Sequence, residues 1–309
     1  MTNKLPCQTY QPAYVMEYPE FVEMARTQNQ IFWTEDEILV EKDIQDIMVN
    51  MTHAEKEAVI FVLKLFTKYE LFAGDEYWAG RVHRTFPKPC IRRMANAFSY
   101  FEINVHAPFY NKLNEALKRN TEEFHNAWKD DPILGERMDF IERHVGGKDD
   151  MLSLAVFSMI EGVVLYSSFA FLKHFQSAGK NLLTNIVRGI AFSVRDENQH
   201  SVAGAALYNL LKRETKEAFD KNWPAIDNYP ALDFDTFIKD KEQLIYEAAE
   251  QIKEHETQII KRLFENGAIE GITEIQMIHF IESRINECLM NLGLEKLYKV
   301  TYNPIAEWF

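Results

Sequence analysis

Apolar residues recur three or four positions apart along most of the chain, and no run of note alternates between apolar and polar residues. This spacing places the apolar side chains on one face of a helix, so it predicts amphipathic helices rather than strands. Prolines and glycines are few, and they gather between the apolar stretches, where they mark loops. We expect helices at 34–48, 53–85, 90–118, 150–176, 180–213, 234–265 and 272–292.

Residues with capping chemistry precede several of these stretches. Thr34 is followed three residues later by Glu37, a spacing typical of a capping box, and the segments THAEKE and DFDTF mark two later starts. Several predicted helices are about 30 residues long, which is well above the usual length in globular proteins. Because the sequence has neither an internal repeat nor a flexible linker, it predicts one all-α domain over residues 1–309, a bundle with long central helices.

The apolar stretch between Asp150 and Lys173 is long enough to span a bilayer, and Glu161 is its only charged residue. It also contains four serines, and its flanks show no bias of basic residues toward one side. A helix that is apolar on every side is otherwise one buried in the middle of a protein. We therefore expect a core helix and no membrane partner.

Charge and cysteine content narrow the class of protein. The chain has 47 acidic and 34 basic residues and a net charge of -13, which disfavours nucleic acid as a partner. Its three cysteines are far apart and odd in number, so they suggest neither a disulfide framework nor a thiolate zinc site. No signal-peptide pattern is present at the N-terminus. These features predict a cytoplasmic location.

Candidate chemistry lies in polar residues that interrupt the apolar helices. In SVRDENQH, Glu197 and His200 are three residues apart, which places a carboxylate and an imidazole on one helix face. In SYFEINVHAPFY, Glu102 and His106 form a similar pair at a spacing of four. Glu161 lies in the most apolar helix, where an unpaired carboxylate is costly and a cation is expected nearby.

A fourth predicted helix offers Asp75 or Glu76 among aromatic residues, in LFAGDEYWAG. Four helices would then each supply an inward acid and two of them a histidine, which is the ligand inventory of a two-metal carboxylate site in a ferritin-like bundle. Such donors suit iron or manganese better than zinc, and they do not choose between the two. Asp196 is placed either to accept the outer N–H of a ligating histidine or to form an ordinary helix salt bridge.

These segments resemble the radical-generating small subunit of class I ribonucleotide reductase, and the resemblance covers nearly the whole chain. RDENQH is similar to the family's Glu-x-x-His helix, and SMIEGVVLYSSFAF is similar to its helix with a single glutamate. The resemblance implies a ferritin-like bundle with two iron or manganese ions, held by Asp75, Glu102, His106, Glu161, Glu197 and His200.

The resemblance also implies a radical route. Tyr110 follows His106 by four residues, as the family's radical tyrosine follows its first ligating histidine. The segment IFWTEDEILVEKD is similar to a Phe-Trp segment of the family, which would make Trp33 a relay residue linked through Asp196 to His106. On this basis the chain generates a radical on Tyr110 and passes it to a large subunit that reduces ribonucleotides. From the residues alone, the alternative is that Tyr110 is a hydrogen-bonded core tyrosine and Trp33 a packing residue at a helix start.

Three departures from the family pattern carry expectations. The family spaces its first glutamate and histidine three apart, so the spacing of Glu102 and His106 predicts a helix bulge or a shifted ligand angle. Asp75 fits the first-ligand position only with a shift of one residue, and Glu76 is its rival. The family continues beyond the stretch similar to YNPIAEWF into a tail that docks on the large subunit, so an end at Phe309 predicts that the tail is absent or truncated.

Partners and alternatives follow from the same resemblance. It implies a homodimer, a large catalytic subunit and a flavoprotein activase as partners. Two other functions remain open from the sequence. One is a ferritin-like dimetal oxidase or hydroxylase acting on its own substrate, and the other is a non-enzymatic metal-binding helical protein.

Overall fold

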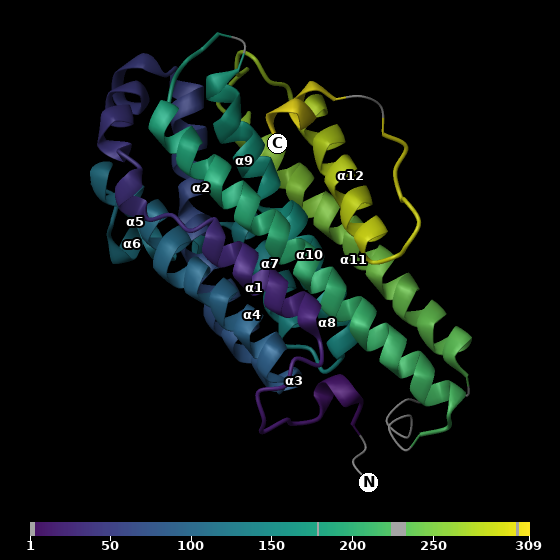
Figure 1. The fold of residues 1–309 in the computed structure, drawn as a ribbon. Coiled ribbons are helices and arrows are strands. Elements are labelled where there is room, and N and C mark those ends of the chain that lie inside the picture. Colours follow the sequence, from purple (N-terminus) through teal and green to yellow (C-terminus); the bar gives the residue numbers. More distant parts are fainter. Residues whose placement is uncertain (1–3, 178, 224–232, 301–302) are drawn as a thin grey trace.

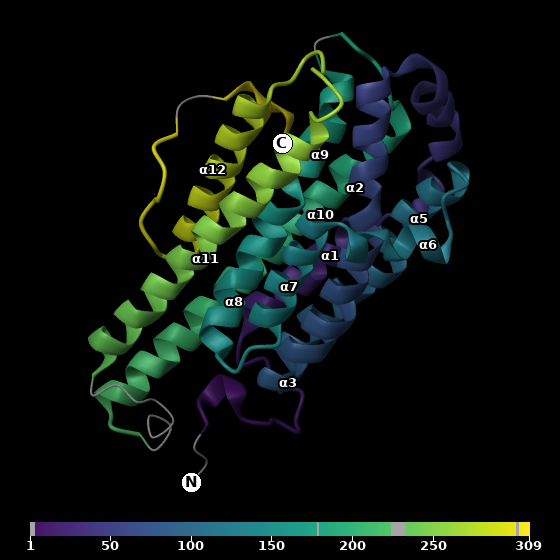
Figure 2. The ribbon, with the colours of Figure 1, turned by 180° about the vertical axis from the view of Figure 1, so that it is seen from behind.

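The computed structural model describes residues 4–177, 179–223, 233–300 and 303–309, and within these ranges the chain forms helices and no strand. Figures 1 and 2 show the long helices side by side in one elongated bundle. This arrangement confirms the predicted all-α fold. The α-helices are α1 (Pro19–Gln30), α2 (His53–Leu71), α3 (His83–Thr85), α4 (Pro89–Phe101), α5 (Ala107–Ala116), α6 (Glu122–Asn126), α7 (Pro132–Val145), α8 (Asp150–Met159), α9 (Tyr166–Lys173), α10 (Thr184–Asp220), α11 (Phe234–Leu263) and α12 (Glu274–Asn291).

Short segments of other helical types connect or interrupt these helices. The wider π-helical segments, in which each backbone hydrogen bond closes one residue later than in an α-helix, are η4 (Asp46–Asn50), η5 (Phe72–Val82), η6 (Glu102–His106) and η8 (Ile160–Val164). The 3-10 turns are η1 (Pro6–Gln8), η2 (Glu35–Glu37), η3 (Val40–Asp43), η7 (Ala127–Asp130), η9 (His174–Gln176) and η11 (Pro304–Trp308).

Three continuous helical rods each contain a π segment. They are α2–η5–α3, α4–η6–α5 and α8–η8–α9, and they correspond to the predicted helices at 53–85, 90–118 and 150–176. The fourth long rod, α10, is a regular α-helix of 37 residues and packs against α8. The capping residues predicted for two starts are also confirmed, because Thr52 caps α2 and Asp233 caps α11.

The prediction of one helix at 34–48 is wrong, because this segment forms the short pieces η2, η3 and η4. Thr34 and Glu37 do form the expected capping box, but it caps only a 3-10 turn. The reason is tertiary, since the carboxylates of the segment cap the start of α10. Asp43 accepts a hydrogen bond from the backbone N–H of Ile186 at 2.7 Å, and Asp46 accepts one from that of Leu183 at 3.0 Å.

The apolar rod α8–η8–α9 is a core helix, as expected. Asp150–Gln176 is the one stretch of the described chain whose length and hydropathy would suit a membrane span, and its apolar window is entirely buried in the bundle. A buried ion pair contacts the middle of this rod, at η8. Arg137 of α7 donates to the backbone oxygen of Val164, at the end of η8, and also pairs with Glu256 of α11. The π segment that carries Glu161 is therefore tied to two neighbouring helices.

Candidate metal centre

Two overlapping groups of buried acids and histidines lie at the centre of the bundle. Within each group, one potential ligand atom per residue lies within 4.8 Å of every other. All six residues are 0% exposed. One group is Glu70, Glu102, His106 and Glu197, and the other is Glu102, Glu161, Glu197 and His200. The three rods with π segments and α10 each contribute to this centre, and Glu102 and Glu197 belong to both groups.

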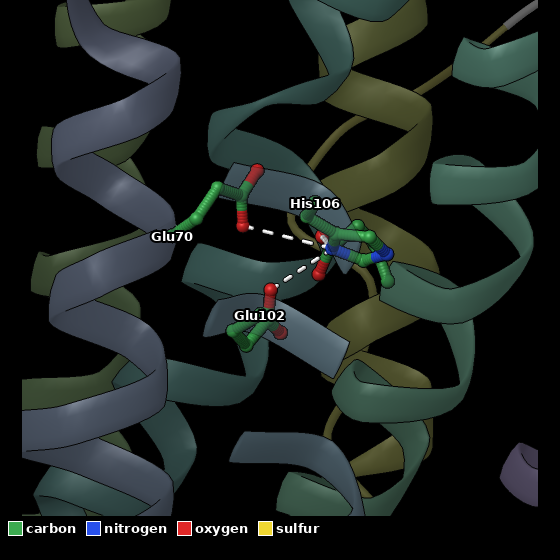
Figure 3. Close-up of side chains that lie close together, drawn as sticks. Glu70, Glu102 and His106 are labelled. Carbon is green, nitrogen blue, oxygen red and sulfur yellow. Dashed lines mark hydrogen bonds and ion pairs between the residues drawn. The ribbon is translucent and has the colours of Figure 1, made fainter. Parts of the chain in front are cut away.

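The pair Glu102 and His106 occupies the two ends of the π segment η6. A π segment has more residues per turn than an α-helix, so a spacing of four brings the two side chains to one face. The Nδ1 atom of His106 lies 2.9 Å from Oε2 of Glu102 and 3.7 Å from Oε2 of Glu70 (Figure 3). Of the two possibilities predicted for this unusual spacing, the local helix bulge is therefore the one that the structure contains.

The pair Glu197 and His200 faces Glu102 from regular α-helix. Nδ1 of His200 lies 2.6 Å from Oε1 of Glu102 and 3.4 Å from Oε2 of Glu197. Despite these short distances, none of these three atoms has a hydrogen bond of acceptable geometry within the described residues. Buried polar atoms in native proteins are normally paired. Carboxylate oxygens and an imidazole nitrogen that converge without hydrogen-bonding to one another are the arrangement expected of ligand atoms around a cation.

The structure brings Glu70 of α2, and not the predicted Asp75, into the buried centre. Asp75 and its rival Glu76 are exposed, and neither belongs to either group. They lie in η5, where the wider helical turn directs Tyr77 and Trp78 into the core and the two acids outward. Helical period was the signal that could have found Glu70, because it lies four residues after the buried Phe66.

The protonation balance of the six residues also indicates a cation site. Burial, together with the neighbouring glutamates, raises the pKa of Glu70 and of Glu161 well above its ordinary value. Burial alone would raise the pKa of Glu102 too, but His200 and His106 hold it low. Burial disfavours the charged form of His200, yet Glu102 and Glu197 raise its pKa to about 9. Without a cation, protons must balance the charge of these acids.

The donor set fits two divalent ions. Four carboxylates carry four negative charges when ionised, which equals the charge of two divalent cations, and two imidazoles complete the set. Oxygen-rich donors with imidazole suit iron and manganese. If the two ions divide the donors as the two groups do, Glu70 and His106 hold one, Glu161 and His200 hold the other, and Glu102 and Glu197 lie between them.

A hydrogen-bonded chain leads from this centre to the segment before η2. Nε2 of His106 lies 3.1 Å from Oδ2 of Asp196, and the indole N–H of Trp33 donates to the same oxygen at 2.8 Å. The rings of Trp33 and His106 lie 5.9 Å apart between centroids. Asp196 thus accepts the outer N–H of His106, one of the two arrangements that the sequence left open. It also lies 3.8 Å from Nε of Arg195, a long contact with a half-exposed partner.

Tyr110 lies in a closed aromatic pocket beside the centre. Its side chain is 0% exposed, and its ring centroid is 4.4 Å from that of Phe66 and 4.9 Å from that of Phe109. Its hydroxyl makes no hydrogen bond of strict geometry within the described residues, and the hydroxyl of Ser193 is the polar group that faces it. Burial, and next the carboxylate of Glu70, raise the pKa of Tyr110 well above its ordinary value.

Comparisons with known proteins point to a single family. The family model described as "Ribonucleotide reductase, small chain" matches residues 13–304. A probable ribonucleoside-diphosphate reductase small subunit of Invertebrate iridescent virus 3 is 25% identical, over 96% of this chain and 77% of the viral protein. The chain spans only 49% to 62% of the length of three other curated relatives that it matches.

Two solved structures share the fold. The dimanganese(II)-NrdF of Streptococcus sanguinis has a TM-score of 0.75 at 19% identity, covering 97% of this chain and 99% of that one. A putative class I ribonucleotide reductase from Bacillus halodurans has a TM-score of 0.78 at 19% identity, covering 100% and 96%. The fold, the paired donor groups and the match of the family model over nearly the whole chain agree, and the chain belongs to the ribonucleotide reductase small-chain family.

Proposed function

We propose that this chain is the radical-generating small subunit of a class I ribonucleotide reductase. The observation that carries the proposal is the chain Trp33–Asp196–His106, which joins a buried tryptophan to a candidate metal ligand through one shared carboxylate oxygen. A storage protein or a purely structural metal site has no use for such a link. When bound, two iron or manganese ions, together with oxygen or a reduced oxygen species as the oxidant, would supply the oxidising power that removes one electron from Tyr110.

The surroundings of Tyr110 suit a stored radical. Because burial keeps its phenol neutral, loss of an electron must be accompanied by loss of the phenolic proton. Glu70 is the carboxylate with the largest influence on the pKa of this hydroxyl, so we assign it as the group that takes the proton. Phe66 and Phe109 exclude water from the ring. The radical would thus be formed beside the centre and shielded from reductants.

Asp196 and Trp33 would then carry the radical toward a large subunit. Asp196 holds the N–H groups of both rings, so it can accept and return a proton while an electron passes between Trp33 and His106. Trp33 is buried, but its neighbour Phe32 is half exposed. Transfer out of this end of the chain would serve the reduction of ribonucleotides to deoxyribonucleotides on the partner.

Four finer points belong to the same proposal. The ions are iron, manganese or one of each, since the donors accept all of these and one similar structure is that of a dimanganese(II) protein. The chain acts as a homodimer with a large subunit. A flavoprotein activase is included as a source of reduced oxygen. The cytoplasm is the proposed location, since the three cysteines are buried and unpaired.

A dimetal oxidase or hydroxylase is the alternative that one observation favours. A pocket of about 540 Å³ is lined by Tyr166, Asn198 and Arg284, among others. Arg284 donates to the backbone oxygen of Gly162 and to Asn198, which are neighbours in sequence of the candidate ligands Glu161 and Glu197. A small substrate could bind there. In that case turnover would need neither Trp33 nor a large subunit.

Electron paramagnetic resonance tests the proposal directly. The protein is loaded anaerobically with iron or manganese, exposed to oxygen with and without reduced flavoprotein, and examined beside Tyr110→Phe. We expect a tyrosyl signal in the wild type and none in Tyr110→Phe. Trp33→Phe should keep the signal but lose ribonucleotide reduction with the large subunit, whereas Trp128→Phe, the matched control, should keep both. Turnover of a small substrate without a large subunit would favour the oxidase.

A further inference from the structure

The longest π segment, η5, contains none of the candidate ligands. Glu70 precedes it, and the acids within it, Asp75 and Glu76, are exposed. It nevertheless lies closely against η6, because a Cβ added at Gly74 would be only 2.6 Å from Ile103. π-helix is rare, appears mostly as single turns, and is frequent at functional sites. This raises the question of what η5 brings to the centre.

The residue that η5 brings there is Trp78. Its indole is 0% exposed, and its N–H donates to Oε1 of Glu161 at 3.1 Å. Its ring also packs edge-on at 5.9 Å from the ring of His200 and 4.9 Å from that of Phe98. Trp78 therefore contacts two candidate ligands of one group, Glu161 through a hydrogen bond and His200 through its ring.

The hydrogen bond makes the two carboxylate oxygens of Glu161 different from each other. An indole N–H is a donor and cannot accept, so it engages one oxygen and leaves the other. The remaining atom, Oε2, has no hydrogen-bond partner within the described residues. Glu70, at the corresponding place in the other group, has no such donor, and both of its oxygens lack a hydrogen-bond partner there. The carboxylate of Glu161 is thus held by a hydrogen bond, whereas that of Glu70 has only the 3.7 Å ion-pair contact with His106.

We propose that Trp78 is a positioning residue for the group Glu102, Glu161, Glu197 and His200. By occupying Oε1 of Glu161, it presents Oε2 as the single binding oxygen and prevents the carboxylate from turning. A ligand held in its binding orientation loses less freedom when the ion arrives, so this position binds its ion more tightly than the position at Glu70. The inference rests on the proposed two-metal site, and it adds that the two positions bind their ions with different affinities.

Stepwise metal binding is the test. Free Mn²⁺ is followed by electron paramagnetic resonance during an anaerobic titration of the whole chain. The key variant replaces Trp78, by site-specific incorporation, with its benzothiophene analogue, which keeps the ring shape and lacks the N–H. Trp78→Phe is the genetically simple second variant. Tyr77→Phe is the matched control, since it alters the adjacent buried ring of η5, whose hydroxyl has no partner within the described residues.

We expect two unequal binding steps in the wild type. In the analogue and in Trp78→Phe, the tighter step should weaken about 10–100-fold, as for other lost outer hydrogen bonds to metal ligands. The weaker step should change less than about threefold, and Tyr77→Phe should leave both steps unchanged. A role in packing alone would lower both steps together, and that result would overturn the inference.

The outcomes also separate this inference from the proposed function. If the wild type binds two ions and forms the tyrosyl radical, while loss of the N–H changes neither step, the inference alone fails. If the wild type does not bind two ions, the proposed function and the inference fail together.

Discussion

The two Glu–His pairs of the centre face each other from helices of different kinds. Glu197 and His200 are three residues apart on α10, which is regular α-helix, whereas Glu102 and His106 are four apart on the π segment η6. Both pairs nevertheless bring a carboxylate and an imidazole into the same buried centre. The comparison teaches that side-chain direction, rather than spacing in the sequence, defines such a pair, because the local helical type converts one into the other.

The largest expected effect comes from removing an acid that both groups share. Glu102→Ala should reduce metal content from about two ions per chain toward none, because Glu102 supplies potential ligand atoms to both groups. Glu197→Ala, the equivalent change on α10, should do the same. Metal analysis after dialysis measures this. Glu70→Ala is the comparison, since it belongs to one group and should cost one ion; equal losses in all three variants would contradict the division into two groups.

A proton-linked effect should follow next in size. A bound ion must displace the proton from His200, whose pKa is raised to about 9, so Mn²⁺ affinity should rise as pH increases from about 6.5 to 9. Each proton released contributes about tenfold per pH unit. The stability of the metal-free protein should change in the opposite direction. The raised pKa of His200 stabilises the fold fully below about pH 6.5, and this contribution is lost as pH rises through 9.

Metal titrations and thermal melts at several pH values measure both trends. His200→Gln is the control, since it removes one titrating imidazole. The slopes of metal affinity and of stability against pH should each decrease by the contribution of one proton. An affinity that does not change with pH would contradict the prediction.

A single deletion tests the equivalence of the two helical types. Removing the exposed Asn104 should convert η6 to α-helix and leave a Glu-x-x-His pair like that of α10, so two ions should still bind, within about tenfold of the original affinity. The matched control removes the exposed Asn198. Helix α10 has no π segment at this point that could absorb the deletion. The deletion therefore leaves Glu197 and His200 two residues apart, on different faces of the helix. Calorimetry with Mn²⁺ measures both, and equal losses would contradict the equivalence.

The smallest expected effect concerns the acid that the sequence favoured. Asp75→Asn should leave metal content unchanged and alter the free energy of unfolding by less than about 0.5 kcal/mol, because the side chain is exposed and lies outside both groups. Glu70→Gln, a change of the same chemical kind on the same rod, should weaken binding of one ion. Loss of metal in Asp75→Asn would restore Asp75 as the ligand.

What the sequence predicted well has a local cause. Glu161 stands alone in an apolar helix, and Glu197 and His200 interrupt another, so each is conspicuous from its neighbours. Glu70 was missed because the choice between Asp75 and Glu76 assumed unbroken α-helical geometry through residues 72–82, where the chain is π-helical. The bulge at Glu102 was foreseen as one of two possibilities, because a spacing of four did not fit the family pattern.

Other errors have a tertiary cause. The segment 34–48 has a good capping box and apolar spacing, yet Asp43 and Asp46 bond to the start of α10 and bend the chain. Helix α1 was not predicted, because it is short and mostly polar, although its buried residues Phe21, Val22 and Ala25 do lie at helical spacing. Its burial depends on α4, which lies about 60 residues later in the chain. Whether the six residues bind metal, and whether Tyr110 holds a radical, stay predictions for experiment.

The π segment at Glu102 also has a consequence for the history of the chain. One added residue in an ancestral Glu-x-x-His helix would produce this spacing if the extra turn absorbed it, leaving Tyr110 four positions beyond His106. An alignment without a gap between positions 102 and 106 would then misplace either the glutamate or the histidine. Pattern searches that demand a fixed interval would pass over chains of this kind, although their acids and histidines converge in the same way.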